Sequence, residues 1–193
     1  VRETLADGDH ERQAFHDDLH HEPGSITTNA GEPYSVYSYF WKKWRDREKE
    51  PPRPAPGDGS LIDPVAIDLD PGDLPPLADL GFEAPEADVE PAGYAAARER
   101  LESFCEDDIY DYEERRDYPA DRCTSRLSAA LKWGTIGVRE VYEATVRAME
   151  RAPDEAAAES VESFRGELAW REFYTHVLYY NPDVVTGNFR EYE

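Results

Sequence analysis

The sequence has little cysteine and no long apolar run. Two cysteines in 193 residues, Cys105 and Cys123, are too few for a disulfide scaffold, and they form no CxxC pair of the kind that binds zinc. No stretch reaches the roughly 18 apolar residues that a membrane helix needs. The chain opens at Val1 without the basic and apolar segments of a secretory signal. These absences favour a soluble, cytoplasmic protein with one domain, or parts of two, and no membrane association.

Several catalytic signatures are also missing. We find no GxGxxG, P-loop, GxSxG or HExxH motif. The segment 16–21 gathers histidines and aspartates, but the glycine and β-branched residues that follow weaken a convergent geometry, so no metal site is predicted. His176 lies near an apolar helix stripe, where we expect it to be a satisfied packing residue rather than an acid or base.

Lysine is scarce and acid is abundant. The net charge is −22, with 43 acidic residues against 21 cations, of which only four are Lys. Since 12% of the residues are aromatic, the chain has enough core-forming material to fold, and its charge belongs on a folded surface. This composition favours a protein from a salt-rich cytoplasm, where the Debye length falls to about 3 Å at 1 M. An ordinary acidic protein is the alternative. Under both interpretations, the negative net charge opposes nucleic-acid binding in dilute buffer.

Composition divides the chain into residues 1–50, 51–93 and 94–193. The first part contains a loop at 24–31, with room for a short strand, and then aromatic residues at helical spacing from Tyr37 to Trp44, with Pro33 in the first turn. The second holds ten of the fifteen prolines and ten carboxylates, and we predict a long inter-domain linker without helix or strand, held to a surface by scattered apolar residues.

The third part is predicted to be entirely helical. Apolar spacing indicates helices at 95–104, 125–133, 138–149 and 156–180, the second closed by Gly134 and the last stopped before Pro182. No internal repeat is visible. The fold class is therefore mainly α.

The last predicted helix has two distinct faces. A helical wheel puts Glu167, Trp170, Arg171 and Tyr174 on one face, opposite an apolar stripe that includes Phe173. One interpretation is a surface ion pair between Glu167 and Arg171, four residues apart and worth about 0.2 to 0.5 kcal/mol. The other is recognition of a nucleobase, because a carboxylate beside an aromatic plane can read the edge of an extruded base while the ring stacks on it.

A second cluster lies at the start of the helix predicted for 125–133. Thr124 is a natural N-cap, and Ser125 and Ser128 add hydroxyls beside free backbone N–H groups. Such a helix start can bind an anion, although a routinely capped helix is the simpler interpretation.

These motifs resemble those of the DNA photolyase and cryptochrome family, specifically the class I photolyases. The matching segments, in order, are YEERRDYP at 112–119, TSRLS at 124–128, GTI at 134–136 and ELAWREFY at 167–174. The segment 24–44 also resembles the end of the family's N-terminal α/β antenna domain and the helix that leaves it. The resemblance implies the end of that antenna domain in residues 1–50, the linker in 51–93, and the first helices of the all-α FAD-binding domain in 94–193.

The resemblance implies a deoxyribodipyrimidine photo-lyase that uses blue light and reduced FAD to split cyclobutane pyrimidine dimers in DNA. A second chromophore of folate or deazaflavin type is possible in a longer parent protein, and a monomer is expected. Because the family's adenine-binding segment and electron-transfer tryptophans do not appear, we expect an interior fragment that is inactive in isolation. A cryptochrome-like FAD photoreceptor and a non-catalytic remnant are the alternatives.

The family's functional residues can be carried over by position. Glu167 would hydrogen-bond the dimer and Trp170 would stack on it, which makes them the expected catalytic pair. The expected DNA-contacting surface also includes Arg116, Arg171 and Tyr174. The expected FAD-binding residues are Tyr112, Thr124, Ser125, Arg126, Leu127, Ser128 and Phe164. Two departures are Phe164, where some relatives place Trp, and Cys123, where a smaller residue is usual.

Overall fold

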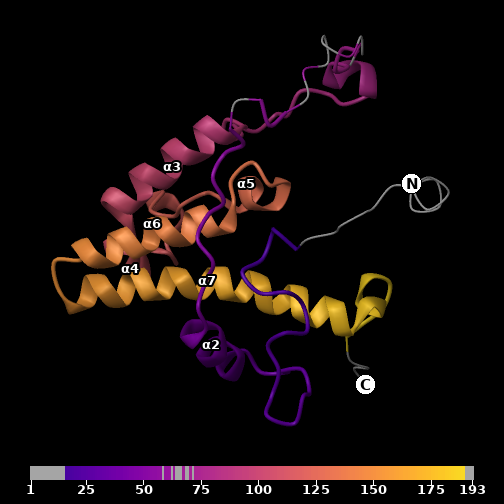
Figure 1. Cartoon of the computed structure of the whole chain (residues 1–193). Helices are drawn as coiled ribbons and strands as arrows, with labels where there is room; N and C mark the ends of the chain where they lie inside the picture. Colours follow the sequence, from indigo (N-terminus) through magenta and orange to yellow (C-terminus); the bar gives the residue numbers. More distant parts are fainter. Residues whose placement is uncertain are drawn as a thin grey trace.

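The computed structural model describes residues 16–57, 59–61, 63, 67, 70 and 72–189. Within these residues the regular structure consists of α-helices and short 3₁₀ helices, and the predicted mainly α fold is confirmed (Figure 1). The short strand considered for 24–31 is reduced to one isolated antiparallel bridge between Thr27 and Pro33. No helix of the described residues combines the length and apolar character needed to cross a membrane.

The helices match the predicted segments, with changes at their ends. The α-helices are α2 (Tyr37–Asp46), α3 (Tyr94–Glu106), α4 (Tyr112–Arg115), α5 (Ser128–Trp133), α6 (Val138–Arg151) and α7 (Glu155–Tyr180). The 3₁₀ helices are η2 (Leu77–Leu80), η3 (Asp108–Tyr110), η4 (Pro119–Asp121) and η5 (Pro182–Val185). Pro33 was wrongly expected in the first turn of α2, which begins at Tyr37.

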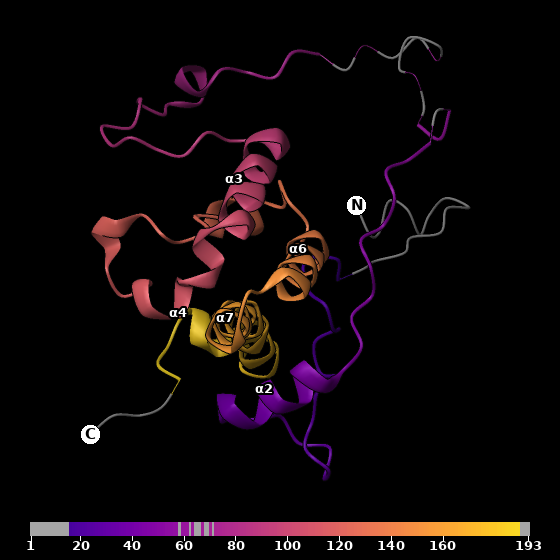
Figure 2. The ribbon, with the colours of Figure 1, turned by 90° about the vertical axis from the view of Figure 1, so that its left-hand side faces the viewer.

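Helix α7 is the axis on which the other elements pack. Viewed along α7 in Figure 2, α6, α4 and α2 surround it, and α3 lies on the far side of α6 and α4. Its start is fixed by Asp154, whose carboxylate accepts a hydrogen bond from the Ala157 N–H at 2.9 Å, as an N-cap does. Its end precedes Pro182, which cannot continue the ladder of helical hydrogen bonds. These two signals explain why the predicted boundaries of α7 were nearly correct.

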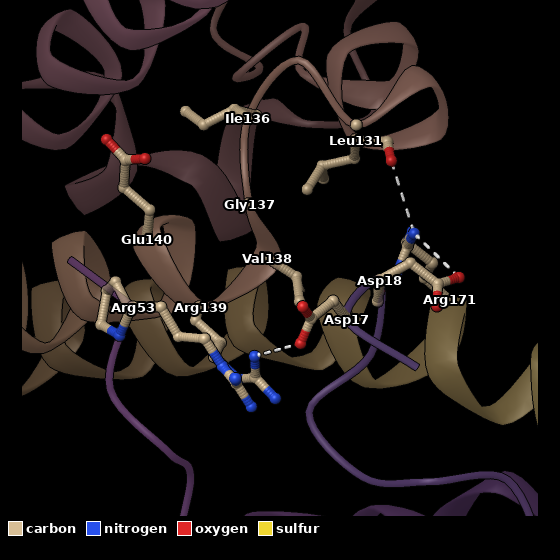
Figure 3. Close-up of a pocket in the computed structure, with 12 residues that line it drawn as sticks. Asp17, Asp18, Arg53, Leu131, Ile136, Gly137, Val138, Arg139, Glu140 and Arg171 are labelled. Atoms are coloured by element: carbon tan, nitrogen blue, oxygen red, sulfur yellow. Dashed lines mark hydrogen bonds and ion pairs between the residues drawn. The ribbon is translucent and has the colours of Figure 1, made fainter. Parts of the chain in front are cut away.

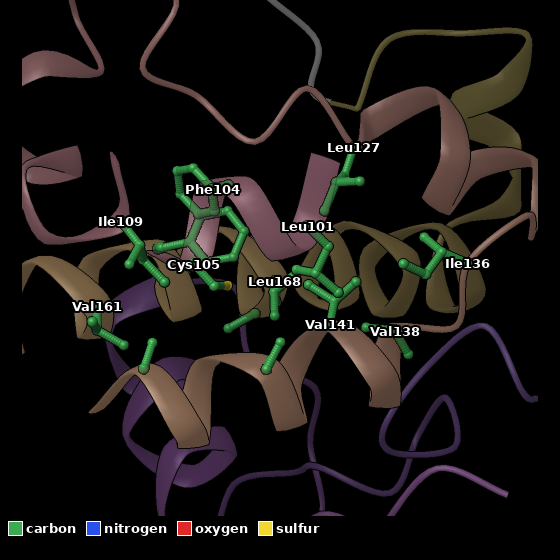
Figure 4. Packing of buried hydrophobic residues seen from close by; sticks show 14 of the residues in the cluster. Leu101, Phe104, Cys105, Ile109, Leu127, Ile136, Val138, Val141, Val161 and Leu168 are labelled. Atoms are coloured by element: carbon green, nitrogen blue, oxygen red, sulfur yellow. The ribbon is translucent and has the colours of Figure 1, made fainter. Parts of the chain in front are cut away.

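The core joins α3, α6 and α7. Figure 4 shows Leu101 and Phe104 of α3 facing Val141 of α6 and Leu168 of α7, all buried. On another side of α7, the aromatic face of α2 is buried as predicted, with Phe40 and Trp44 among the least exposed side chains. Burying side chains of this size contributes roughly 1.5 to 3 kcal/mol each. Packing on both sides therefore holds α7 in place.

The proline-rich segment differs from its prediction in two respects. It contains the short helix η2, and its described apolar residues are not anchored, because Leu74 is 95% exposed and Phe82 is 63% exposed. The expectation that scattered apolar side chains hold the segment to a surface is therefore wrong for these residues. Figure 2 shows much of the segment running well outside the group of helices.

Candidate functional site

One cavity collects every residue that was predicted to bind the cofactor. It has a volume of about 570 Å³ and lies where α4, α5 and the loop before α5 meet α7. We call it the α4–α5–α7 cavity. Its lining consists of Tyr112, Thr124, Ser125, Arg126, Leu127, Ser128, Leu131, Lys132, Phe164, Glu167, Leu168 and Arg171. Residues from three separated motifs of the sequence are thus brought to one surface.

The loop before α5 does not have the predicted helix-start geometry. The α5 helix begins at Ser128, three residues later than expected, so Thr124 is not an N-cap. Arg126 takes a left-handed backbone conformation with φ of 50°, which costs a non-glycine residue about 1 kcal/mol. The side chain of Leu127 is buried in the core and so fixes the loop there. The guanidinium of Arg126 forms an ion pair with Glu90 at 2.5 Å. The loop is therefore held by tertiary contacts rather than by a cap.

The hydroxyl groups of this loop are free to meet a ligand. Within the described part of the chain, the side chains of Thr124, Ser125 and Ser128 make no hydrogen bond, although all three line the cavity. Three cations, Lys132, Arg126 and Arg171, line it as well. The anion-binding chemistry predicted for this segment is thus present in the side chains, whereas the helix-start geometry is not.

The floor of the cavity is aromatic. Tyr112 meets Phe164 edge to face, with ring centroids 5.4 Å apart, and Phe104 supports Phe164 from the core at 4.7 Å. Helix α4 is tied to α7 by Ser160, whose hydroxyl donates to the Ile109 carbonyl at 2.8 Å and accepts from the Glu113 N–H at 3.0 Å. Burial raises the pKa of Tyr112, which keeps this phenol protonated. The two rings can therefore offer neutral, apolar contacts to part of a flat ring, although at 84° to one another they do not form one plane.

Glu167 pairs across helices and not along its own helix. Its carboxylate lies 2.8 Å from the guanidinium of Arg116, which follows α4. The i, i+4 ion pair between Glu167 and Arg171 considered from the sequence is therefore wrong. Since Arg116 and Glu167 keep about a third or more of their side-chain area exposed, the pair orients the carboxylate more than it stabilises the fold.

A second concavity, the aromatic groove, adjoins the first. Its volume is about 430 Å³, and it is lined by Tyr37 and Trp41 of α2, Arg116, and the α7 residues Glu167 and Trp170, among others. Glu167 lines both concavities, whereas Trp170 lines only the groove. Glu167 and Trp170, the residues predicted to read the dimer, thus line the same groove, and Glu167 also lines the neighbouring cavity.

The remaining DNA-contacting candidates lie on either side of Trp170. Tyr174 is 63% exposed, and its ring stacks on Trp170 with centroids 5.5 Å apart. Arg171 lines the α4–α5–α7 cavity and donates to the carbonyl oxygens of Asp18 and Leu131. Figure 3 shows Arg171 also at the edge of a third cavity, of about 380 Å³, in which Arg139 binds Asp17 at 2.8 Å.

Sequence reasoning missed a buried carboxylate on the same helix. Glu172 is 1% exposed, and its two oxygens accept the backbone N–H groups of His20 at 2.9 Å and His21 at 3.1 Å. Burial raises the pKa of Glu172 to about 7, although the two N–H donors oppose the shift. Leu168 and His176, one turn away on each side, are buried too, and this position between them was the available signal.

The three histidines near Glu172 are packing residues with few polar contacts. Burial lowers the pKa of His20 and of His21 to about 3, so both rings are neutral. His176 is buried against Phe40 as expected, but it is not satisfied, because neither ring nitrogen has a hydrogen-bond partner among the described residues. Within the described residues, no group of three or more His, Cys, Asp or Glu side chains could hold a metal ion.

Comparison with known proteins identifies the family. The model of the DNA photolyase family matches residues 1–57. A deoxyribodipyrimidine photo-lyase of Halobacterium salinarum is 53% identical over the whole of this chain. The chain belongs to the DNA photolyase family.

Photolyases from further organisms resemble the chain over most of its length. A deoxyribodipyrimidine photo-lyase of Synechococcus is 40% identical over 90% of the chain. The crystal structure of a class III photolyase from Agrobacterium tumefaciens superposes on 98% of the chain and 39% of its own length, with a TM-score of 0.79 and 27% identity. The class I subdivision suggested by the motifs stays a prediction. The chain spans about 40% of the length of the Halobacterium relative and 37% of the Synechococcus one.

Proposed function

We propose that this chain forms the lesion-facing part of a deoxyribodipyrimidine photo-lyase, which splits cyclobutane pyrimidine dimers in DNA with blue light and reduced FAD. One observation carries the proposal. Glu167 stands between a cavity suited to a flat, phosphate-bearing cofactor and a groove lined by Trp170 and Arg116. A photoreceptor that does not repair DNA has no need for a carboxylate and an indole placed to read a base.

The residues present fit a flavin nucleotide. Tyr112 and Phe164 offer apolar contacts to a planar ring, while three unpaired hydroxyls and the nearby cations suit phosphate oxygens. These seven residues would hold FAD: Tyr112, Thr124, Ser125, Arg126, Leu127, Ser128 and Phe164. Bound reduced FAD would supply the electron that opens the dimer under blue light.

The chain's own side chains would recognise and orient the lesion. The carboxylate of Glu167 can accept a hydrogen bond from a pyrimidine N–H, and Arg116 fixes its direction through the 2.8 Å ion pair. Trp170 offers an aromatic face for stacking on an extruded base, and we expect Arg116, Arg171 and Tyr174 to contact the strand around it. These contacts must overcome a net charge of −22, so DNA binding is expected to be favoured by high salt rather than weakened.

The finer assignments from the sequence are also proposed. Residues 1–50 would be the end of an antenna domain and 51–93 the linker to a FAD-binding domain at 94–193. The protein would act in the cytoplasm as a monomer, with a folate or deazaflavin chromophore possible in a longer parent protein. The family membership of the chain and the match of residues 1–57 to the family model support this division.

A chimera tests the function. This chain would replace the matching segment of the Halobacterium salinarum photo-lyase, to which the whole chain aligns at 53% identity. Loaded with FAD, the chimera should repair thymine dimers under blue light, and Glu167→Gln should lower the repair rate about 10-fold or more, since one charged hydrogen bond to the lesion is lost. A matched control is Glu150→Gln, on the exposed side of α6, which should repair normally. A chimera that binds FAD but repairs nothing would favour a photoreceptor, and one that binds no FAD would favour a remnant.

A further inference from the structure

Tyr37 of α2 makes two contacts with α7. Its ring lies face to face on the indole of Trp170, with centroids 3.5 Å apart and planes inclined by 10°. Its hydroxyl donates a hydrogen bond of 2.7 Å to the carbonyl oxygen of Gly166, one helical turn before Trp170. One side chain from a distant part of the sequence thus contacts both Gly166 and Trp170 of α7.

The surroundings make this contact rigid. Phe173 meets the rings of both Tyr37 and Trp170 nearly edge-on, with interplanar angles of 70° and 77°. Glycine at 166, in the middle of a long helix, costs about 0.5 to 1 kcal/mol relative to Ala. A Cβ at this position would lie 3.4 Å from the Tyr37 hydroxyl, an ordinary van der Waals contact, so the hydroxyl packs directly against this turn of α7. An indole held between a stacked ring and an edge-on ring cannot rotate freely about its own side-chain bonds.

The hydroxyl of Tyr37 also remains a donor. Burial raises the pKa of Tyr37, and the negative charge of Glu167 raises it further. Tyr37 therefore keeps its proton at neutral and moderately alkaline pH. Glu167 is the residue expected to read the lesion, so the anchor of the indole and the reading carboxylate line the same groove.

We propose that Tyr37 is the positioning residue that sets the plane of the Trp170 indole for stacking on a pyrimidine dimer. Tyr37 and Tyr174 each cover part of the indole, so the extruded base stacks on the part that both leave open. Because the indole is already fixed before DNA binds, its side chain loses little conformational entropy on binding, and this raises the affinity for the lesion. The inference rests on the proposed function for its ligand, but the geometry of the indole can be measured without DNA.

The experiment compares three variants of the full chain in molar KCl. Tyr37→Leu removes the stacked ring, Tyr37→Phe removes only the hydroxyl, and Tyr39→Leu is the control on the exposed side of the same helix. The first readout is the Trp170 part of the near-UV circular dichroism and of acrylamide quenching, obtained by subtracting the same data for Trp170→Phe. The second is the ratio of affinities for a thymine-dimer oligonucleotide and the undamaged one.

The proposal predicts graded effects. Tyr37→Leu should lower the affinity ratio about five-fold, the size of an aromatic pair's contribution, and should make Trp170 more accessible to acrylamide. Tyr37→Phe should keep the circular dichroism signal and lower the ratio about two-fold, the size of a weak hydrogen bond. Tyr39→Leu should change neither readout. In the Trp170→Ala background, Tyr37→Leu should have no further effect on the ratio.

Other outcomes would overturn the role of Tyr37. If Tyr37→Leu loses thermal stability but keeps both the Trp170 signal and the affinity ratio, Tyr37 only packs α2 on α7. If Tyr37→Leu does not fold, Tyr37→Phe decides. An affinity ratio and a quenching rate equal to those of wild type would then show that Tyr37 only packs α2 on α7. If the wild-type chain shows no preference for the dimer, the proposed function fails, whereas the Trp170 spectra still decide whether Tyr37 orients the indole.

Discussion

Glu167 and Glu172 lie five residues apart on α7, yet they have opposite environments. Glu167 is partly exposed and shares a single ion pair with Arg116, facing two concavities. Glu172 is fully buried, with both oxygens bound to the backbone of the 16–22 segment. One carboxylate is available to a ligand, and the other is consumed by the fold. The comparison shows that a charged residue in a helix motif does not by itself indicate a ligand site. Whether its carboxylate is available to a ligand depends on the groups that it already binds within the fold.

Removing the buried carboxylate should have the largest effect on stability. Glu172→Ala leaves two buried N–H donors without an acceptor, at about 1 to 3 kcal/mol each, so we expect a loss of about 4 kcal/mol in the free energy of unfolding. Chemical denaturation in molar KCl measures it. Glu150→Ala, at an exposed site on α6, should change stability by less than about 0.5 kcal/mol. Equal effects of the two variants would remove the distinction between the two environments.

The pH dependence of stability should sharpen the same contrast. Glu172 has a pKa of about 7 in the folded state against 4.5 for an ordinary Glu, so the folded state holds its proton longer than the unfolded state. Its contribution to the free energy of unfolding therefore falls as pH rises from 4.5 to 7, by about 3 kcal/mol. His20 and His21, with folded pKa values of about 3, act in the opposite direction between pH 3 and 6.5.

The variant Glu172→Gln isolates this contribution, because it removes the titrating group and leaves both histidines. Relative to the variant, wild type should lose about 3 kcal/mol of stability between pH 4.5 and 7.5. Denaturant unfolding of both proteins at several pH values measures the difference. Parallel pH profiles would show that Glu172 does not titrate as its burial requires.

The exposed pair should contribute little to stability. A double-mutant cycle on Arg116 and Glu167 is expected to give a coupling free energy of about 0.5 kcal/mol at low salt and less in 1 M KCl, where screening is stronger. Over the same change in salt, the stability of the whole chain should rise, since its 22 excess negative charges repel one another less. A coupling above about 2 kcal/mol would mean that the pair is a structural clamp instead of an adjustable recognition element.

The sequence predicted the helices better than the side-chain partners. Helix α6 follows from its amphipathic spacing, and helix α7 is bounded by the N-cap Asp154 and by Pro182, all of which are local signals. The left-handed conformation of Arg126 is not local, because an ordinary arginine avoids it, and here the buried Leu127 and the ion pair with Glu90 impose it. The short helix α5 was therefore predicted to begin too early.

The candidate site shows the same limit. Six of the seven expected FAD-binding residues could be named because they belong to recognisable motifs, and Phe164 was carried over by its position in the family resemblance; the fold brings all seven together. The partner of Glu167 could not be named from spacing, since Arg116 is 51 residues away and competes with the local choice, Arg171. Glu172 was missed because its partners are backbone N–H groups about 150 residues away, and a sequence shows no sign of where such donors will lie in the fold.

The most direct test of the central claim is the affinity of the chain for a single-stranded oligonucleotide that contains one thymine dimer, measured in molar KCl for Trp170→Ala and for Trp133→Ala. Trp133 is 76% exposed and lies outside the aromatic groove. If the indole of Trp170 stacks on the lesion, Trp170→Ala should weaken binding of the damaged strand by about 1 to 3 kcal/mol and leave the undamaged strand unaffected, whereas Trp133→Ala should change neither. Equal binding by wild type and Trp170→Ala would contradict the claim that this surface of α7 recognises the dimer.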